Sequence, residues 1–129
     1  MAVKELLHAC PVGVAIVSAD LERKLYANEK LAKLFGAETP ESFLLVREED
    51  TWCDETRFSS LKEYMQSGQE VVNYVAKRRK LDGSTLWISM NSQIAEVDGI
   101  VARILWMTDV TELVEMMKEQ TTAPQALSA

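Results

Sequence analysis

The feature that most constrains the fold is the region from Gln69 to Thr108, where strand-like segments are separated by two Asp-Gly pairs. Alternation of apolar and polar residues with a period of two is typical of a strand with one buried face. Asp-Gly is a strong signal for a two-residue hairpin turn, because both central residues of that turn need positive φ angles. Asp82-Gly83 and Asp98-Gly99 therefore predict a three-stranded antiparallel meander over residues 69–80, 84–95 and 100–108.

The segments before this meander predict two more strands and several short helices. Strands are expected over residues 14–18 and 24–27, which are rich in apolar residues. The helices are expected to start at the capping residues Asn28, Thr39 and Asp54. Five antiparallel strands with short helices on one face form an α+β layer, which is the fold class that we expect.

Two amphipathic helices are expected to flank this core. Near the N-terminus one apolar stripe has the i, i+3, i+4, i+7 spacing of a helix face and consists of Val3, Leu6, Leu7 and Cys10. The last helix follows the polar joint 108–111 directly. We therefore expect a flanking helix over residues 1–11, a core over 12–110, a C-terminal helix over 111–120 and a linker stub over 121–129.

The strand that begins near Ser84 indicates which side of the sheet faces the helices. Leu86, Ile88, Met90 and Ile94 alternate with a mainly polar set, so the apolar set is expected to face inward. Carrying this parity across the Asp82-Gly83 turn predicts a second inward set, namely Val72, Tyr74, Ala76 and Arg78. In the last strand, Val101, Arg103, Leu105 and Met107 are expected on the same inner side.

The opposite face of the sheet is also apolar and needs cover. Trp87, Ile104 and Trp106 are expected to lie there. The N-terminal helix is the candidate cover, alone or together with a second subunit. The chain is therefore expected to form a homodimer, with interface candidates Val3, Leu6, Leu7, Cys10, Trp87, Ile104 and Trp106.

Composition excludes several classes of function. The 129 residues suit one domain, and 14 basic against 20 acidic residues give a net charge of −6, which argues against nucleic acid or an anionic membrane as partner. No apolar run approaches the ~18 residues of a membrane span. Two cysteines without paired spacing fit a reducing cytoplasm, where we expect the protein to reside.

The sequence offers no set of residues typical of catalysis or metal binding. It contains no His–carboxylate pair, nucleophile motif or glycine-rich phosphate loop, so we expect no enzyme activity. His8 is the single histidine, and a metal site needs more ligands than one. No metal site is therefore expected.

Arg78 and Arg103 are unusual among residues expected to face inward. They can lie near strand ends and extend to water, or Arg78 can pair with a carboxylate. Alternatively, the two guanidinium groups attract an anionic ligand such as a carboxylate.

Four segments resemble a PAS domain, the small sensory module of bacterial signalling proteins. Asn28 resembles the asparagine that opens the first core helix of the family, and Leu31–Gly36 resembles the end of that helix. The run Arg79–Trp87 resembles the basic, Asp-Gly, aromatic hairpin of the family. Residues 108–112, Thr-Asp-Val-Thr-Glu, resemble its Asp-Ile-Thr strand ending, so the resemblance extends from about Leu7 to Leu113.

The resemblance implies a non-catalytic cytoplasmic sensory and dimerisation domain. The larger protein would be a histidine kinase of a two-component system, a cyclic-dinucleotide enzyme or a transcription regulator, and its output domain would be a partner. The alternative is a ligand-free interaction module that works through the outer face with Trp87 and Trp106.

In PAS domains some inward residues line a small cavity, which here would hold a small-molecule ligand or be filled by side chains. The candidates for this pocket are Ile16, Tyr26, Phe35, Phe58, Leu61, Met65, Tyr74, Arg78, Ile88, Met90, Arg103, Leu105 and Met107. The cofactor is unknown. The flavin-binding branch has an Asn-Cys-Arg-Phe run where Thr51-Trp52-Cys53-Asp54 stands here, and the haem branch has a histidine on its central helix, so neither flavin nor haem is expected.

The joint between the last strand and the last helix has two compatible interpretations. Asp109 can accept a hydrogen bond from the N–H of Glu112 while Glu112 reaches back, as in a capping box. The resemblance implies in addition that Asp109, Thr111 and Glu112 couple the sheet to an output helix.

Overall fold

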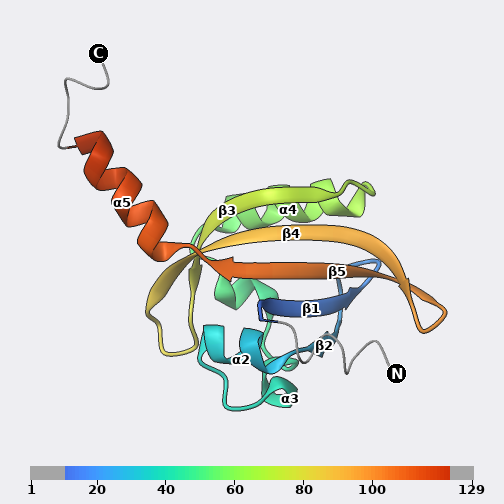
Figure 1. Cartoon of the computed structure of the whole chain (residues 1–129). Coiled ribbons are helices and arrows are strands. Elements are labelled where there is room, and N and C mark those ends of the chain that lie inside the picture. Colours follow the sequence, from blue (N-terminus) through green and yellow to red (C-terminus); the bar gives the residue numbers. More distant parts are fainter. Residues whose placement is uncertain (1–10, 123–129) are drawn as a thin grey trace.

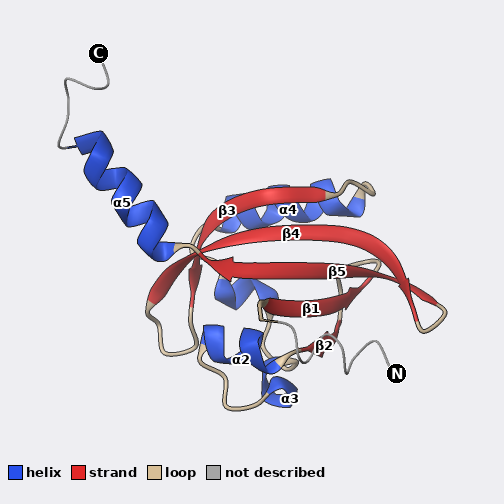
Figure 2. Ribbon diagram, viewed as in Figure 1, coloured by secondary structure: helices blue, strands red, loops and turns tan. Residues whose placement is uncertain are grey.

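The computed structural model describes residues 11–122, which form a five-stranded antiparallel sheet with helices packed on one face (Figures 1 and 2). The order of strands across the sheet is β2-β1-β5-β4-β3. The strands are β1 (Gly13–Ser18), β2 (Lys24–Ala27), β3 (Val71–Arg79), β4 (Thr85–Val97) and β5 (Ile100–Asp109). This confirms the predicted α+β class and the meander of the last three strands.

The helical elements lie between β2 and β3 and after β5. They are α2 (Glu29–Phe35), α3 (Pro40–Phe43), the 3-10 helix η1 (Glu48–Thr51), α4 (Glu55–Gln66) and α5 (Thr111–Thr122). Figure 1 shows α5 extending away from the sheet at the end of β5. The expected N-terminal helix with Val3, Leu6, Leu7 and Cys10, and the chain end after residue 122, lie outside the described residues.

The predicted helix starts are confirmed because capping is a local interaction. Asn28, Thr39 and Asp54 each accept a hydrogen bond from the backbone N–H three residues later. Gly36 ends α2 with a φ angle of 81°, a conformation that glycine adopts without a steric penalty. The Asp98-Gly99 turn likewise has positive φ angles at both residues, as predicted.

The predicted inward set of β3 is wrong at its first member. Val72 is 75% exposed, whereas Val71 is 5% exposed. Opposite β4, Val71 pairs with Ser92 and Tyr74 pairs with Met90, so β3 contains one residue more than β4 over this interval. Asn73 has a φ angle of 50° and takes up the extra residue as a bulge, which reverses the alternation on its N-terminal side.

Ile16 and Tyr26, predicted to face the helices, lie on the opposite face. Ile16 opposes both Tyr26 and Ile104, and directly opposed residues share a face. Ile16 packs in a separate cluster from the main core. The physical reason is that β1 lies between two other strands and is buried on both faces, so its apolar run carries no alternation from which to assign a face.

The other end of the sheet also departs from the predicted inner set. Val101 and Ile94 are exposed although their parity is that of inward residues. Both lie close to the Asp98-Gly99 turn, where β4 and β5 run beyond the main core. Parity alone therefore does not guarantee burial at the end of a long hairpin.

Asn28 connects the sheet to the first helix. Its Oδ1 accepts hydrogen bonds from the backbone N–H groups of Val14 and Leu31, both at 3.0 Å, and its Nδ2 donates to the carbonyl of Val12 at 2.9 Å. Asn28 is fully buried, so water does not replace these partners. The one side chain thus caps α2 and fixes it against β1.

Asn28→Ala is expected to lower the free energy of unfolding by about 2–4 kcal/mol, because a helix cap is lost and buried backbone groups lose their partner. Chemical denaturation monitored by circular dichroism measures this change. Lys30→Ala, on the exposed side of α2, is the matched control and should leave stability within about 0.5 kcal/mol. Equal effects of both changes would contradict the structural role given to Asn28.

Candidate functional site

A cavity of about 540 Å³ lies between the inner face of the sheet and the helical segments. Its apolar walls come from β1, β4 and β5 on one side and from α4 and the segment before η1 on the other. The apolar residues of the wall are Val17, Leu21, Leu44, Leu45, Val46, Trp52, Phe58, Leu61, Met65, Met90 and Leu105. The cavity has the position of a small-molecule site, and its apolar residues form one part of such a lining.

Charged side chains line part of the same cavity. Among the described residues, the cations are Arg23, Lys24, Arg47 and Lys62, and the carboxylates are Glu22, Glu48 and Glu49. Three ion pairs join members of this set: Lys62 with Glu22 at 3.5 Å, Arg47 with Glu49 at 2.8 Å, and Lys24 with Glu48 at 3.5 Å. The cavity is therefore amphipathic.

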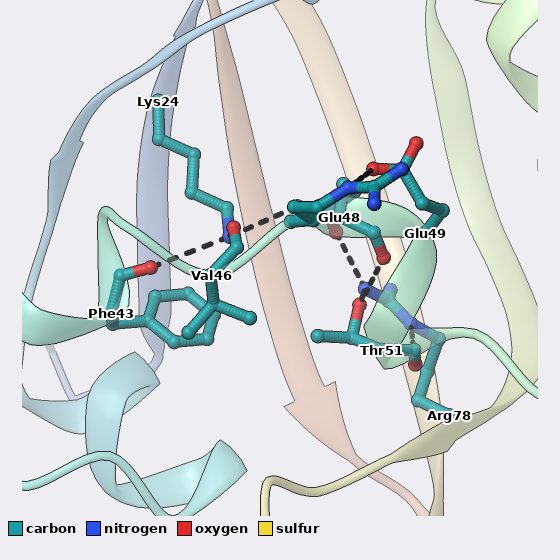
Figure 3. A network of polar contacts seen from close by, with 8 residues as sticks. Lys24, Phe43, Val46, Glu48, Glu49, Thr51 and Arg78 are labelled. Carbon is teal, nitrogen blue, oxygen red and sulfur yellow. Dashed lines mark hydrogen bonds and ion pairs between the residues drawn. The ribbon is translucent and has the colours of Figure 1, made fainter.

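Glu48 is the centre of this polar network (Figure 3). One carboxylate oxygen lies 3.5 Å from Lys24 Nζ, and the other accepts a hydrogen bond from Arg78 Nη2 at 2.6 Å. Lys24 is on β2 and Arg78 is on β3, the two edge strands of the sheet. One carboxylate on η1 therefore links both edges of the sheet across its inner face.

Lys24 is held by backbone oxygens as well as by Glu48. Its Nζ donates to the carbonyl of Val46 at 2.6 Å and to that of Phe43 at 3.4 Å, and lies 4.2 Å from the centre of the Phe43 ring. Burial lowers the pKa of Lys24 below its ordinary value, while the Glu48 carboxylate acts in the opposite direction. The ammonium group of Lys24 is thus removed from water, and its contacts offset only part of the free-energy cost of burying its charge.

Arg78 neither extends to water nor lines the cavity. Its side chain is 2% exposed, and its Nε and Nη2 donate to the carbonyl and the hydroxyl of Thr51 at 3.0 and 2.7 Å. The guanidinium also lies 4.3 Å from the Trp52 ring. Burial lowers the pKa of Arg78 and Glu48 opposes that effect, so pairing with a carboxylate is the interpretation that the geometry supports.

Arg103 fixes the end of α4 to the sheet. It is 1% exposed, and its Nη1 and Nη2 donate to the hydroxyl of Ser92 and the carbonyl of Met65, both at 3.0 Å. Met65 lies in the last turn of α4, where unpaired carbonyls and the helix dipole favour a cation. Burial lowers the pKa of Arg103, and the charge of Glu70 acts against this shift.

Part of the predicted pocket set does line the cavity. The members that do are Phe58, Leu61, Met65, Met90 and Leu105. The remaining members lie elsewhere: Ile16 and Tyr26 on the outer face, and Phe35, Tyr74, Arg78, Ile88, Arg103 and Met107 on the inner side but outside the described lining. Whether the lining residues bind a ligand stays a prediction.

Sequence reasoning missed Lys24, Glu48 and Trp52. Residues 46–53 have no periodic pattern, so their fold against the sheet had no local signal. Lys24 and Glu48 are separated by more than twenty positions, and nothing in the sequence pairs them. Trp52, between Thr51 and Cys53 in a polar segment, was the one available signal, because a large aromatic residue in such a segment is usually buried.

The joint between β5 and α5 is fixed to β4. Thr111 Oγ1 accepts a hydrogen bond from the backbone N–H of Trp87, and the N–H of Val110 donates to the carbonyl of Trp87, both at 2.9 Å. The predicted capping partner is wrong: Asp109 accepts from the N–H of Thr111, at 2.9 Å, rather than from that of Glu112. The hydrogen bond from Thr111 closes a tight turn at Asp109. Thr111 is the first residue of α5, so this turn lies directly before the helix.

The outer face contains the three residues predicted for it. Ile104 lies opposite Ile16, Trp106 lies opposite Val14, and Trp87 alternates with the buried Leu86 and Ile88. All three of Trp87, Ile104 and Trp106 are half-buried. Their part in a dimer interface stays a prediction.

Within residues 11–122, the acidic, histidine and cysteine side chains form no group arranged to hold a metal ion. The helices of this part of the chain are all too short or too polar to cross a membrane. Cys53 belongs to a separate polar surface depression and not to the described lining of the cavity.

Comparison with known proteins identifies the fold. No family model matches the sequence, and no curated protein matches it. An RNA-binding light-oxygen-voltage receptor has a TM-score of 0.79 at 18% identity over 95% of this chain, which spans 36% of the length of that receptor.

Two isolated domains match at nearly full length. A PAS domain from a two-component sensor histidine kinase gives a TM-score of 0.67 at 12% identity, covering 82% of this chain and 91% of that domain. The PAS domain of a LuxR-family transcriptional regulator from Burkholderia thailandensis, solved in complex with ethanol, gives 0.67 at 16% identity, covering 85% and 98%. The chain therefore has the PAS fold.

Glu48→Gln is expected to lower the free energy of unfolding by about 2 kcal/mol, because Lys24 and Arg78 then remain buried without a counter-charge. Glu49→Gln is the matched control on the same turn. It breaks the exposed pair with Arg47 and removes a weaker, longer-range effect on Lys24, so it should change stability by less than about 0.5 kcal/mol. Urea denaturation of both variants measures the difference, and a Glu48 effect no larger than the Glu49 effect would contradict the central role of Glu48.

Proposed function

We propose that this chain is a cytoplasmic sensory domain of a larger signal-transduction protein, such as a sensor kinase or a transcription regulator. It binds a small molecule in the cavity. Binding changes the arrangement of α5 and thereby acts on the output domain. The domain itself performs no catalysis.

The observation that carries this proposal is that the cavity and the joint are built on the same two strands. Met90 of β4 and Leu105 of β5 line the cavity. Trp87 of β4 binds the joint, and Asp109 at the end of β5 is part of it. A change in the spacing or twist of these strands at the cavity therefore acts directly on the residues that hold the start of α5.

The second candidate is a ligand-free interaction module. It is favoured by the exposed apolar side chains of α5, because Leu113, Met116 and Met117 are each more than half exposed. Such a set on one helix is typical of a surface that contacts another protein. In this alternative the cavity is filled by side-chain movement and only the surfaces act.

Native mass spectrometry of the freshly purified chain distinguishes the two candidates. We expect a homodimer that carries a defined additional mass, which identifies a retained ligand. Denaturing mass spectrometry of the same sample is the control, because a noncovalent ligand is lost there. A dimer of bare mass, unchanged after incubation with a cell metabolite extract, would favour the interaction module.

Thr111→Val tests the joint with little change in side-chain shape. It removes the acceptor of the Trp87 N–H, a hydrogen bond worth about 1 kcal/mol, so amide exchange at Trp87 and in the first turn of α5 should become roughly fivefold faster. Hydrogen exchange monitored by NMR measures this change.

Thr108→Val is the control, since Thr108 is exposed on β5 and is not part of these hydrogen bonds. Unchanged exchange at Trp87 in the Thr111 variant would show that this contact does not hold α5 to the sheet.

A further inference from the structure

We propose that the ligand of the cavity is a small amphiphilic carboxylate, with one anionic head and an apolar body. The inference rests on the proposed ligand-binding function and specifies the chemical class of the ligand. It follows from the balance of charges, from one unpartnered polar group and from the apolar part of the wall.

The charge around the cavity is opposite in sign to that of the whole protein. The chain has a net charge of −6, yet the described lining holds four cations and three carboxylates, and Arg78 lies directly behind Glu48. A concave site with a net positive charge and low-dielectric walls favours a bound anion. An anionic ligand is therefore favoured at the cavity although the protein as a whole repels anions.

Around Glu48, positive charge exceeds negative charge. Lys24 and Arg78 share the single carboxylate of Glu48, so two buried cations have one counter-charge. A buried charge is unfavourable unless it is paired and hydrogen-bonded. A ligand carboxylate beside Lys24 supplies the second anion.

Lys24 is able to exchange its present contacts for a ligand. Of its three polar contacts only the one to Val46, at 2.6 Å, is short. Those to Phe43 at 3.4 Å and to Glu48 at 3.5 Å are longer than the usual distance of a charge-assisted hydrogen bond, about 2.7–2.9 Å. A carboxylate can replace the long contacts with a short one while the bond to Val46 is kept.

Trp52 provides an independent indication of a missing acceptor. It lines the cavity and is 4% exposed, and its indole Nε1 is buried with no hydrogen-bond partner among the described residues. Buried polar groups of native proteins are nearly always hydrogen-bonded. The nitrogen itself has almost no accessible surface, so an oxygen atom of a ligand reaches this N–H only when neighbouring side chains move.

The remaining wall limits the rest of the ligand to apolar groups. Val17, Met90 and Leu105 of the sheet face Phe58, Leu61 and Met65 of α4 across the cavity. This part offers few partners for hydroxyl or phosphate groups, which would be buried at a cost of about 1–3 kcal/mol each. Sugars and polyphosphates are therefore disfavoured, and an alkyl or aryl chain fits.

The test compares ligands with the same body and different heads. Calorimetry on the full chain uses phenylpropionate, phenylpropanol and phenylpropylamine, and then octanoate, octanol and octylamine. The carboxylate of at least one series is expected to bind about tenfold or more tightly than its alcohol, and the amine most weakly, because only the carboxylate forms an ion pair with Lys24.

The indole N–H signals of the three tryptophans report the site of binding in NMR spectra. The signal of Trp52 is expected to shift with the carboxylate, whereas those of Trp87 and Trp106, on the other side of the sheet, serve as internal controls. A shift confined to Trp87 or Trp106 would place binding outside the cavity and overturn the inference.

Lys24→Met should reduce the affinity for the carboxylate to that for the alcohol and leave the alcohol unchanged. Lys24→Arg retains the charge and should keep the preference, which also guards against a folding defect in the methionine variant. Lys33→Met, an exposed lysine of α2 outside the cavity, is the matched control and should change neither affinity.

The outcomes separate this inference from the proposed function. Equal affinity for carboxylate and alcohol at the cavity would overturn the carboxylate and leave a ligand-binding sensory domain. Failure of every probe to bind would also overturn it, and the proposed function would then be judged by the mass of a co-purified ligand. Both the inference and the proposed function would be overturned only if every probe failed to bind and the purified dimer carried no additional mass.

Discussion

The position of η1 over the sheet depends on the single carboxylate of Glu48. It binds Lys24 from one edge strand and Arg78 from the other, so η1 is held as a strap across the inner face of the sheet. The isolated bridge between Trp52 and Arg78 attaches the end of the strap to β3. Glu48 and Glu49 of η1 line the cavity, so the attachment of η1 to both edge strands helps to define this wall of the cavity.

Buried ion pairs are not the simplest means of holding a segment such as η1 over a hydrophobic core. Replacing a buried ion pair with apolar residues of similar volume is often neutral or stabilising, because two charges no longer lose their hydration. The network is therefore better understood as a device that positions the segment and leaves a polar wall beside apolar residues. Apolar closure would instead favour collapse of the segment onto Phe58, Leu61 and Met65, with loss of the cavity.

The parts of the fold that could be predicted are those with local signals. The Asp98-Gly99 turn, the caps at Asn28, Thr39 and Asp54, and the alternation of β4 each depend on neighbouring residues and are confirmed. The Asp82-Gly83 hairpin forms, but only Gly83 has a positive φ angle, and the connection over residues 80–84 is longer than the predicted two-residue turn. The bulge at Asn73 could not be predicted, because an Asn in a strand has no sequence mark that separates a bulge from regular pairing. The face on which each β1 residue lies could not be assigned from the sequence, because a strand buried on both sides shows no alternation of apolar and polar residues.

Only the apolar half of the candidate site could be predicted from the sequence, because only this half has a local signal. Phe58, Leu61 and Met65 follow helical spacing on α4, so their inward direction was visible in the sequence. The polar half joins β2, η1 and β3, which are far apart in the chain and meet only after the sheet has formed. Long-range ion pairs of this kind depend on tertiary structure and leave no periodic pattern.

Under the proposed function, the energy available at the joint suits a switch. Two hydrogen bonds to Trp87 hold the start of α5, and each contributes a net of about 1 kcal/mol. Coupling between sites in regulated proteins is typically about 1–3 kcal/mol, so a ligand needs only a modest difference in affinity between two arrangements of β4 and β5 to change the hold on α5. A joint with many more contacts would keep α5 in one position whether or not the cavity is occupied. A joint without these contacts would not couple α5 to the sheet at all.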